Sequence, residues 1–414
     1  MLSILINAYA CSPNMGSEPG MAWNWCVNLA KHCELHIITE GEFRDKIETV
    51  LPTLPQGKNM HFYYNPVSDE IRKMCWNQGD WRFYKHYRYW QWKTYLMAKV
   101  IIQQHHIDII HQLNMIGFRE PGNLWKIEHK PFVWGPIGGL KQFPDAYMQG
   151  AGLKMKIFNK LKNRINIYQI KHDKRVDLAL KKANLLISSI PDSYKAIKRY
   201  KGLESVIIPE TGCFLEKENF IRIDKSNRTG LNLLWVGKFD FRKQLEIALR
   251  TIAALKHLQD VKLIICGTGT EQQTSYYKTL ASNLGITQQV VWKGSLPNKD
   301  VLTEMCNADL FFFTSVSEDT STVVLEAVSY NLPVLCFNTC GMGYVINEKV
   351  GIKVPLSDPK QSVEDFAEKI EYLYNHRDYL QLLSDGCKER QRELSWDNKA
   401  LKMVSLYDEV MRNR

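Results

Sequence analysis

The chain has 414 residues, 45% of them apolar and 24% charged, with a formal net charge of +10. At about 100–200 residues per domain, this length predicts two globular domains. The composition is too apolar and aromatic for a disordered protein, and no apolar run approaches the roughly 18 residues that cross a bilayer. The apolar N-terminus lacks a basic n-region, so we interpret it as a first strand rather than a signal peptide.

Ten cysteines are scattered without a Cys-x-x-Cys pair or the spacing of a structural zinc site. We therefore expect a cytoplasmic protein without disulfides. Charge divides the chain, because residues 1–205 hold 29 Lys and Arg against 17 Asp and Glu, whereas residues 206–414 hold 25 against 27. A basic half beside a nearly neutral half indicates two domains with different partners.

A short β-branched run, a loop and an amphipathic helix recur along the chain. Strands are predicted at 3–9, 35–39, 61–65, 107–111, 132–135, 185–189, 206–209, 231–237, 261–267, 289–294, 309–315, 332–337 and 351–354. This alternation is typical of βαβ units in a buried parallel sheet. Because the series runs twice, we predict an α/β fold of two doubly wound, Rossmann-like domains that face a central cleft.

The domain boundary should lie in the polar stretch 216–230, which has few core-forming residues. We therefore predict domains at 1–210 and 211–395. The last segment, 395–414, has the pattern of an amphipathic helix capped by Ser395, although pattern alone does not say where it packs.

Ligands bind beyond the carboxyl ends of the strands in an open α/β sheet. After the strand 309–315, Glu318 and Glu326 can line one site only if Glu318 lies in the loop and Glu326 on the following helix. Ser321 and Thr322 then occupy the cap and first turn, whose free N–H groups favour a phosphate. Glu326 is suited to accept hydrogen bonds from ribose hydroxyls. The alternative is a solvated glutamate and a second one that stabilises the helix dipole.

A basic loop follows the strand 231–237. Lys238, Arg242 and Lys243 cluster there, and such cations hold a diphosphate and offset the charge on a departing nucleotide. The alternative is an ordinary basic surface loop. No two aspartates are separated by a single residue, so no Asp-x-Asp pair is available to hold Mg²⁺ or Mn²⁺ on a diphosphate. We therefore expect no metal and assign this work to the basic loop.

Glycine-rich loops follow three strands, at 9–23, 134–139 and 266–272. Gly16 and Gly20 in the first of them allow close approach of a ligand to the backbone, although an ordinary turn has the same composition. The Gly-x-Gly-x-x-Gly fingerprint is absent from all three, which argues against a nicotinamide enzyme.

His111 ends the strand 107–111. It could hydrogen-bond a substrate, or it could be a structural histidine whose ring is satisfied in the core.

With these residues in view, the chain resembles the family-four (group 1) nucleotide-sugar-dependent glycosyltransferases of GT-B fold. The resemblance is most specific in the second half, in Gly-Lys-Phe-x-x-Arg-Lys (237–243), Gly-Thr-Gly (267–269), Lys-Gly-Ser-Leu-Pro (293–297) and Glu-Ala-Val…Leu-Pro-Val (326–334). In the first half, Gly-Ser-Glu-Pro-Gly-Met-Ala-Trp-Asn-Trp and Gly-Pro-Ile-Gly-Gly resemble a branch common among bacterial polysaccharide enzymes.

The resemblance implies a retaining, metal-independent hexosyltransferase that takes a sugar from a UDP-, GDP- or ADP-sugar and needs no other cofactor. Glu318 would bind the donor sugar, Glu326 the ribose, and Lys238 and Lys243 the diphosphate. Further donor contacts are implied at Gly237, Arg242, Gly267, Ser295, Leu296, Pro297, Ser321, Thr322 and Val323, and from the first domain at Gly16 and Ser17. The last helix, about 396–414, would return to the N-terminal domain.

Two departures from the family pattern stand out. Lys238 replaces the usual arginine, which keeps the charge but loses bidentate geometry. The loop 134–139 replaces the usual N-terminal-domain histidine that meets the donor sugar. His111, Gly138 and Gly139 remain candidates for the acceptor side.

Two segments concentrate the positive charge of the first half. Residues 71–99 carry seven Lys and Arg, one acid and nine aromatics, and residues 151–182 carry ten Lys and Arg against two Asp. Basic amphipathic helices of this kind suit an anionic membrane surface, and no nucleic-acid recognition motif is present. The alternative is a solvated helix face with the aromatics in the core. We expect docking on the inner face of the plasma membrane to reach a lipid-linked saccharide.

The leading hypothesis is transfer of a sugar to a glycan or lipid-linked saccharide, in bacterial cell-surface polysaccharide synthesis. The alternatives are a same-fold epimerase or phosphorylase, and a non-catalytic partner that binds only nucleotide sugar or membrane.

Overall fold

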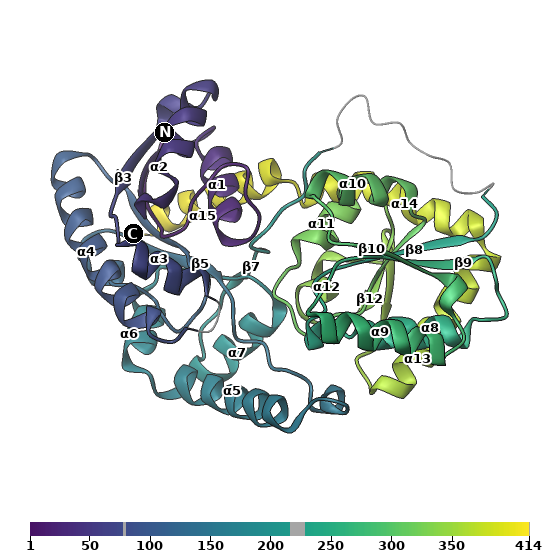
Figure 1. Ribbon diagram of the computed structural model, residues 1–414. Coiled ribbons are helices and arrows are strands. Elements are labelled where there is room, and N and C mark those ends of the chain that lie inside the picture. Colours follow the sequence, from purple (N-terminus) through teal and green to yellow (C-terminus); the bar gives the residue numbers. More distant parts are fainter. Residues whose placement is uncertain (78–79, 216–227, 414) are drawn as a thin grey trace. The chain divides into compact units, whose positions relative to one another are not determined.

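The computed structural model describes residues 1–77, 80–215 and 228–413. Most of the expected linker, 216–230, therefore lies outside the described residues. The described part divides into two compact units (Figure 1). The first unit comprises Met1–Leu140, Arg164–Glu210 and Trp396–Arg414, and the second comprises Lys141–Asn163 and Thr211–Ser395.

Each unit is built on one parallel sheet, and every predicted strand is present. The strands are β1 Ser3–Ala8, β2 Glu34–Thr39, β3 Met60–Tyr64, β4 Ile109–Asn114, β5 Phe132–Ile137, β6 Leu185–Ser188, β7 Val206–Ile207, β8 Leu231–Val236, β9 Val261–Cys266, β10 Val290–Gly294, β11 Leu310–Phe313, β12 Val334–Phe337 and β13 Gly351–Val354. Within the described residues the first sheet has the order β3-β2-β1-β4-β5-β6-β7 and the second β10-β9-β8-β11-β12-β13. Both orders are those of doubly wound sheets, so the predicted fold class is confirmed.

The helices are α1 Ser17–Leu29, α2 Arg44–Val50, α3 Asp69–Trp76, α4 Phe83–Gln104, α5 Leu153–His172, α6 Lys174–Lys182, α7 Pro191–Lys201, α8 Leu245–Ala254, α9 Glu271–Asn283, α10 Asn298–Asn307, α11 Thr322–Ser329, α12 Cys340–Val345, α13 Pro359–Asn375, α14 Arg377–Glu393 and α15 Trp396–Arg412. The helices up to α12 lie between these strands along the chain, and α13, α14 and α15 follow β13. No helix in the described ranges combines the length and the apolar character needed to span a bilayer. All ten cysteines are described, and no two of them form a disulfide.

The first sheet is covered on both faces because its strands are apolar on both sides. Ile4 and Ile6 of β1 pack in a cluster with α1 and α15, whereas Leu5 between them packs in a second cluster with α4, α6 and α7. The second sheet is covered by α8, α9 and α13 on one face and by α10, α11 and α14 on the other (Figure 1).

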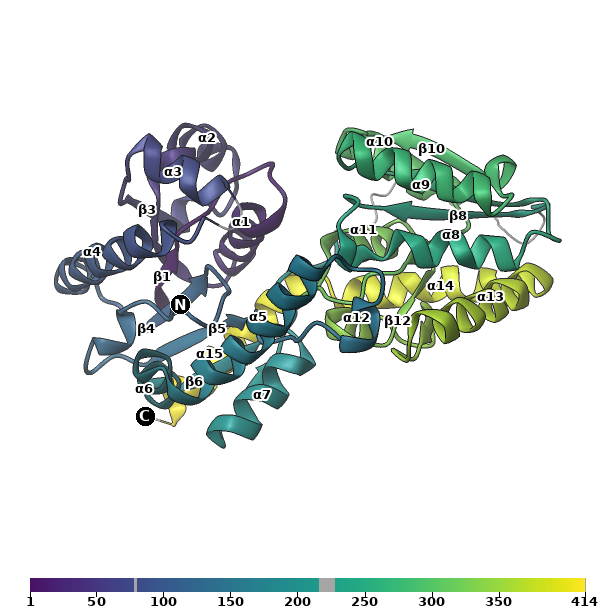
Figure 2. The same ribbon diagram turned by 60° about the horizontal axis from the view of Figure 1, so that its bottom comes forward.

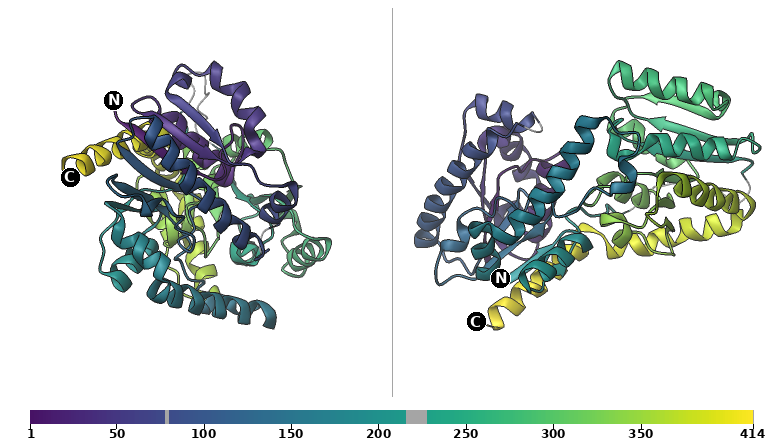
Figure 3. Two further views of the ribbon diagram at one scale, coloured as in Figure 1. Left: turned by 90° about the vertical axis from the view of Figure 1, so that its left-hand side faces the viewer. Right: turned by 90° about the horizontal axis from the view of Figure 1, so that it is seen from below.

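The last helix packs on the first unit, as predicted. Trp396, Met403 and Tyr407 of α15 are buried with residues of α1, and the indole of Trp396 packs edge-on against Trp25 at 5.9 Å between ring centroids. Both ends of the chain consequently lie on this unit (Figure 3).

The prediction that all of 1–210 belongs to the first domain is wrong for Lys141–Asn163, which belongs to the second unit. Apolar packing decides this assignment. Phe143, Tyr147 and Met148 are buried in the core of the second unit, Phe143 stacks on Phe241 at 5.9 Å, and the hydroxyls of Tyr147 and Ser362 lie 2.6 Å apart.

Candidate active site

The candidate site lies at the carboxyl ends of β8 and β11, which are neighbours in the second sheet. The strand order reverses between them, and ligands of doubly wound sheets bind at such a switch point. The loop after β8 contains a short 3₁₀ turn, Phe241–Lys243, and the loop after β11 contains Glu318. The basic loop after β8 and the loop that carries Glu318 are therefore adjacent in the structure.

Glu318 forms ion pairs with two cations of the basic loop. Its Oε1 accepts a hydrogen bond from Nζ of Lys243 at 3.0 Å, and its Oε2 pairs with the guanidinium of Arg242. Burial by itself would raise the pKa of the Glu318 carboxyl, but Lys243 and Arg242 together outweigh burial and hold this pKa below its usual value. The carboxylate therefore stays ionised at neutral pH and is ready to accept hydrogen bonds.

The path of the Lys243 side chain depends on a glycine. A Cβ on Gly237 would lie 2.5 Å from Cδ of Lys243, so a larger residue at 237 would displace the lysine. On its other side the ammonium lies 4.9 Å from the centre of the Phe313 ring. The side chain is 11% exposed, so the lysine delivers a nearly buried cation to the site.

Hydrogen bonds fix the basic loop to the end of β11. The hydroxyl of Thr314 donates to the carbonyl of Lys243 at 2.7 Å, and the backbone N–H of Val316 donates to the carbonyl of Arg242 at 3.0 Å. Trp235 in turn donates from Nε1 to the hydroxyl of Thr314 at 3.0 Å. The two loops thus hold each other in place, which preorganises the charged groups.

Glu326 lies on α11, one element beyond Glu318, as the sequence predicted. Helix α11 begins at Thr322, and its N-cap Ser321 makes no side-chain capping hydrogen bond. Burial raises the pKa of the Glu326 carboxyl, only partly countered by the amide of Asn298, which donates from Nδ2 at 3.4 Å. A half-buried carboxylate with one long hydrogen bond has acceptor capacity left for a ligand's hydroxyls.

Glycines line the carboxyl edge of the second sheet next to this site. A Cβ on Gly267 would lie 1.8 Å from the carbonyl oxygen of Gly237, so the loops after β8 and β9 touch through their backbones. The N–H of Gly267 also donates to the carbonyl of Gly294, at the end of β10, at 2.7 Å. Ser295, Leu296 and Pro297 follow at once and precede α10, with Ser295 and Pro297 exposed.

The structure brings Arg242, Lys243 and Glu318 together, but it does not join Lys238 to this group. Lys238 lies in the same loop with its side chain exposed, and within the described residues it makes no ion pair. Gly16 and Ser17 are exposed at the start of α1 in the first unit.

His111 is a structural histidine, so the prediction that it serves the acceptor side is wrong. It is completely buried on β4, its Nδ1 lies 2.5 Å from the hydroxyl of Tyr407, and its Nε2 lies 2.7 Å from the carbonyl of Gly135. Burial lowers the pKa of His111 to about 4, so the ring is neutral. Gly138 and Gly139 follow β5, where the N–H of Gly138 donates to the carbonyl of Ile116 at 2.7 Å.

Sequence reasoning missed an ion pair next to Glu318. Lys141 pairs from Nζ with Oδ2 of Asp319 at 2.5 Å, and both side chains are 19% exposed. The two residues are 178 positions apart, and Lys141 follows a strand of the first sheet, so no local pattern places them in one unit. Only the packing of Phe143 and Tyr147 into the second core could have revealed this pair.

Comparison with known proteins agrees with this geometry. Residues 216–392 match the family described as "Glycosyl transferases group 1". The chain contains a group 1 glycosyltransferase domain. This domain holds Arg242, Lys243, Glu318 and Glu326, whereas Lys141 lies outside the matched residues.

Curated relatives of the glycosyltransferase domain are distant. An uncharacterized glycosyltransferase of Methanocaldococcus jannaschii is 28% identical over 198 residues, which cover 47% of this chain and 49% of that protein. A D-inositol 3-phosphate glycosyltransferase of Salinispora tropica is 26% identical over 200 residues, which cover 46% of this chain and 40% of that protein. The chain thus matches less than half the length of these relatives.

Solved structures resemble the whole chain in fold. A sucrose-phosphate synthase from Thermosynechococcus elongatus aligns with a TM-score of 0.66 at 15% identity and covers all of both chains. The Anabaena protein HepE, solved in complex with UDP, aligns with a TM-score of 0.61 at 14% identity over 99% of this chain and all of that one. The GT-B fold class is confirmed by these likenesses.

Proposed function

We propose that the chain is a retaining hexosyltransferase that moves a sugar from a nucleoside diphosphate sugar to a glycan or lipid-linked saccharide. The observation that carries this proposal is the ionised Glu318 between Lys243 and Arg242 at the switch point of the group 1 domain. A diphosphate is the natural competitor for these two cations, because it accepts strong charge-assisted hydrogen bonds from both. Release of Glu318 from them would free its oxygens for sugar hydroxyls.

Each part of the donor has a matching group in this site. Glu326 accepts hydrogen bonds from the ribose, the first turn of α11 at Thr322 and Val323 meets the diphosphate, and the residues after β10 meet the base. Arg242 and Lys243 offset the charge that grows on the departing diphosphate, which is where electrostatic catalysis acts. In the proposed reaction, Arg242 and Lys243 do the work that a metal ion on the diphosphate would do.

The transfer balances without a protein nucleophile. The bond between the anomeric carbon and the diphosphate oxygen breaks, and the bond to the acceptor oxygen forms on the same face of the sugar. The departing phosphate oxygen takes the proton of the acceptor hydroxyl. The anomeric configuration is therefore retained.

A donor screen tests this proposal. We expect one of UDP-, GDP- or ADP-sugars to raise the Tm of the full chain, because a ligand that binds only the folded state stabilises it. That donor should be hydrolysed slowly, and Glu318→Ala should abolish this hydrolysis while the nucleotide still binds. Binding with no turnover by the wild type would favour a non-catalytic nucleotide-sugar partner instead, and an inverted anomeric product would contradict retention.

The acceptor side of the proposal concerns the long helix α5 (Figure 2). This helix carries an exposed apolar stripe. Ile157, Leu161, Ile165 and Tyr168 recur at helical spacing, and their exposed fractions lie between 41% and 67%. Only Asn166 and Ile170 of this helix are buried. Five of the six Lys and Arg on α5, at 154, 156, 160, 162 and 164, lie among the apolar residues.

This pattern favours a membrane surface over a solvated helix face, because an apolar stripe in water has no stabilising partner. Helix α4 carries aromatic residues of both kinds, some in the core and some on the surface. Tyr87 and Trp90 are buried in the core, whereas Tyr89 and Trp92 are exposed and stacked on each other at 6.2 Å. We therefore propose α5 as the principal docking helix for an anionic bilayer that carries the lipid-linked acceptor.

Liposome flotation tests the docking. We expect the full chain to float with vesicles that contain anionic lipid, and Leu161→Asp to reduce the recovered fraction severalfold. Leu382→Asp changes a leucine on α14 that is 62% exposed, against 54% for Leu161, and is the matched control. Equal recovery with neutral and anionic vesicles would reject the role of charge, and equal recovery of both variants would reject α5.

A further inference from the structure

Three side chains with metal-ligating atoms meet at one edge of the first sheet, away from the carboxyl ends of its strands. Glu34 and His36 lie two residues apart on β2, so they project from the same face of the sheet. His61 on β3 is the register partner of His36 and therefore joins the same face. Strand pairing alone thus brings together residues 25 positions apart in the sequence.

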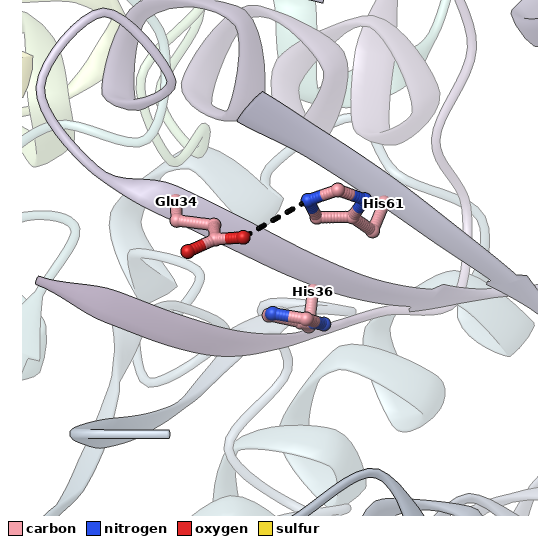
Figure 4. A group of neighbouring side chains, drawn as sticks. All are labelled: Glu34, His36 and His61. Carbon is pink, nitrogen blue, oxygen red and sulfur yellow. Dashed lines mark hydrogen bonds and ion pairs between the residues drawn. The ribbon is translucent and has the colours of Figure 1, made fainter. Parts of the chain in front are cut away.

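The ligating atoms of these side chains are close enough to share one ion. One atom from each of Glu34, His36 and His61 lies within 4.8 Å of the other two (Figure 4). Nε2 of His61 lies 3.2 Å from Oε1 of Glu34, and the two imidazole rings stack at 5.0 Å. Ligands about 2.0–2.1 Å from a tetrahedral ion stand about 3.4 Å apart, so small side-chain rotations suffice.

The hydrogen bonding of His36 leaves one of its ring nitrogens for coordination. Its Nδ1 lies 3.0 Å from the hydroxyl of Tyr63, and no other residue in the described ranges hydrogen-bonds its Nε2. A histidine that binds a metal through one nitrogen usually engages an oxygen through the other, which fixes the ring. Tyr63, two residues after His61 on β3, supplies that oxygen here.

We propose that Glu34, His36 and His61 form a binding site for a divalent transition-metal ion, with Zn²⁺ as the ion of choice. Two imidazoles and one carboxylate are a ligand set that zinc accepts, and they leave a fourth position for water or another external ligand. The side chains of Glu34 and His61 are 45% and 43% exposed, so an ion can enter from solvent.

The proposed ion has a structural role in this position. Strand β3 is the edge strand of the first sheet, and only β2 pairs with it in the described residues. The ion would tie β3 to β2 through side chains in addition to the backbone ladder. Because Glu34 begins β2, the site lies at the amino end of the strand, opposite to the carboxyl edge at which ligands of doubly wound sheets bind.

Metal titration of the full, metal-stripped chain tests the proposal. We expect one Zn²⁺ to bind per chain and to raise the Tm. Glu34→Gln and His61→Ala change exposed side chains, so both variants should keep the metal-free Tm of the wild type. Each should weaken zinc binding at least about tenfold.

His257→Ala is the matched control. His257 pairs with Glu371 at 2.9 Å on the surface of the second unit, as His61 pairs with Glu34. Within the described residues, however, His257 belongs to no group of three side chains that could share a metal ion. This variant should bind zinc like the wild type. Co²⁺ bound to the wild type should show visible bands without thiolate charge transfer, because no cysteine contributes. Absence of binding, unchanged affinity in His61→Ala and Glu34→Gln, or a thiolate band would each overturn the proposal.

Discussion

In the second sheet, charged groups occupy the carboxyl ends of β8 and β11, whereas in the first sheet amides occupy the same position between β1 and β4. Asn7 donates from Nδ2 to Oε1 of Gln91 at 2.7 Å and to Oε1 of Gln112 at 2.8 Å, and all three are buried. Asn114 donates from Nδ2 to the carbonyl of Ala10 at 2.7 Å and so joins the end of β4 to the loop after β1.

The two sheets share one topology, but their switch points suit different tasks. A buried network of neutral amides rigidifies a scaffold without attracting an anion. A cluster of Lys243, Arg242 and Glu318 holds charges that a diphosphate sugar can engage. Topology therefore marks where a ligand can bind, and side-chain chemistry distinguishes the sheet that we propose for the donor from the other one.

The largest effect should come from Glu318, which distinguishes the charged switch point from the amide one. We expect Glu318→Gln to lower donor turnover by roughly 10²–10³-fold, because a neutral amide stabilises the transition state far less than a carboxylate. Turnover is measured as release of nucleotide from the matched donor. Glu389→Gln removes an exposed carboxylate paired with Lys349 at 2.9 Å, and this control should retain full activity.

The two lysines of the basic loop should differ. Lys243→Met removes the nearly buried cation that pairs with Glu318 and should raise the donor KM and lower kcat/KM about 100-fold. Lys238→Met removes an exposed cation and should cost about tenfold or less. Steady-state kinetics of both variants with one donor measures this difference, and a greater loss in Lys238→Met would reverse the assignment of the principal cation.

Adding one methyl group at Gly237 should act through Lys243. We expect Gly237→Ala to displace the Lys243 stem and raise the donor KM about tenfold, since a Cβ there would lie 2.5 Å from Cδ of the lysine. Gly152→Ala adds the same methyl where nothing lies within 4 Å, and its kinetics should be unchanged. If both variants behave alike, the glycine does not position the lysine.

The substitution Glu326→Gln should raise the stability of the fold and weaken the binding of the donor. Burial raises the folded-state pKa of Glu326, so the folded chain holds this proton more tightly than the unfolded chain. The corresponding contribution to stability is present at low pH and is lost as pH rises through the raised pKa. Glu326→Gln should therefore raise the Tm at pH 8 more than at pH 5, while it weakens donor affinity about tenfold. Thermal denaturation at both pH values and calorimetry of donor binding measure the two effects.

The smallest effect on activity should come from the first sheet. Tyr407→Phe leaves the buried Nδ1 of His111 without its partner, and this costs about 1–3 kcal/mol of unfolding free energy. We expect a Tm lower by several degrees and unchanged kcat/KM. A loss of turnover without a loss of stability would place His111 in the reaction after all.

The sequence predicted the sheets better than the contacts between distant segments. Every strand was predicted because each is a short apolar run bounded by turn residues, and the places of Glu318 on a loop and Glu326 on a helix followed from their spacing. The pairing of Arg242 with Glu318 depends on β8 and β11 being neighbours in the sheet. The sequence motifs around these two residues do not predict strand order.

Other features depend on packing or register, so local pattern could not show them. The assignment of Lys141–Asn163 to the second unit depends on where Phe143 and Tyr147 are buried. His111 has the same strand position whether it faces a ligand or the ring of Tyr407. The group of Glu34, His36 and His61 depends on the register of β2 with β3, and its spacing in the sequence matches no metal motif.

Amide hydrogen exchange of the full chain, with and without the matched nucleoside diphosphate, tests most directly whether the second sheet is the donor-binding one. We predict that the nucleotide slows exchange in the loop 237–244 and in residues 315–326, and leaves the buried β1 and β4 unchanged. Protection confined to the loops after β1 and β4 would contradict this account.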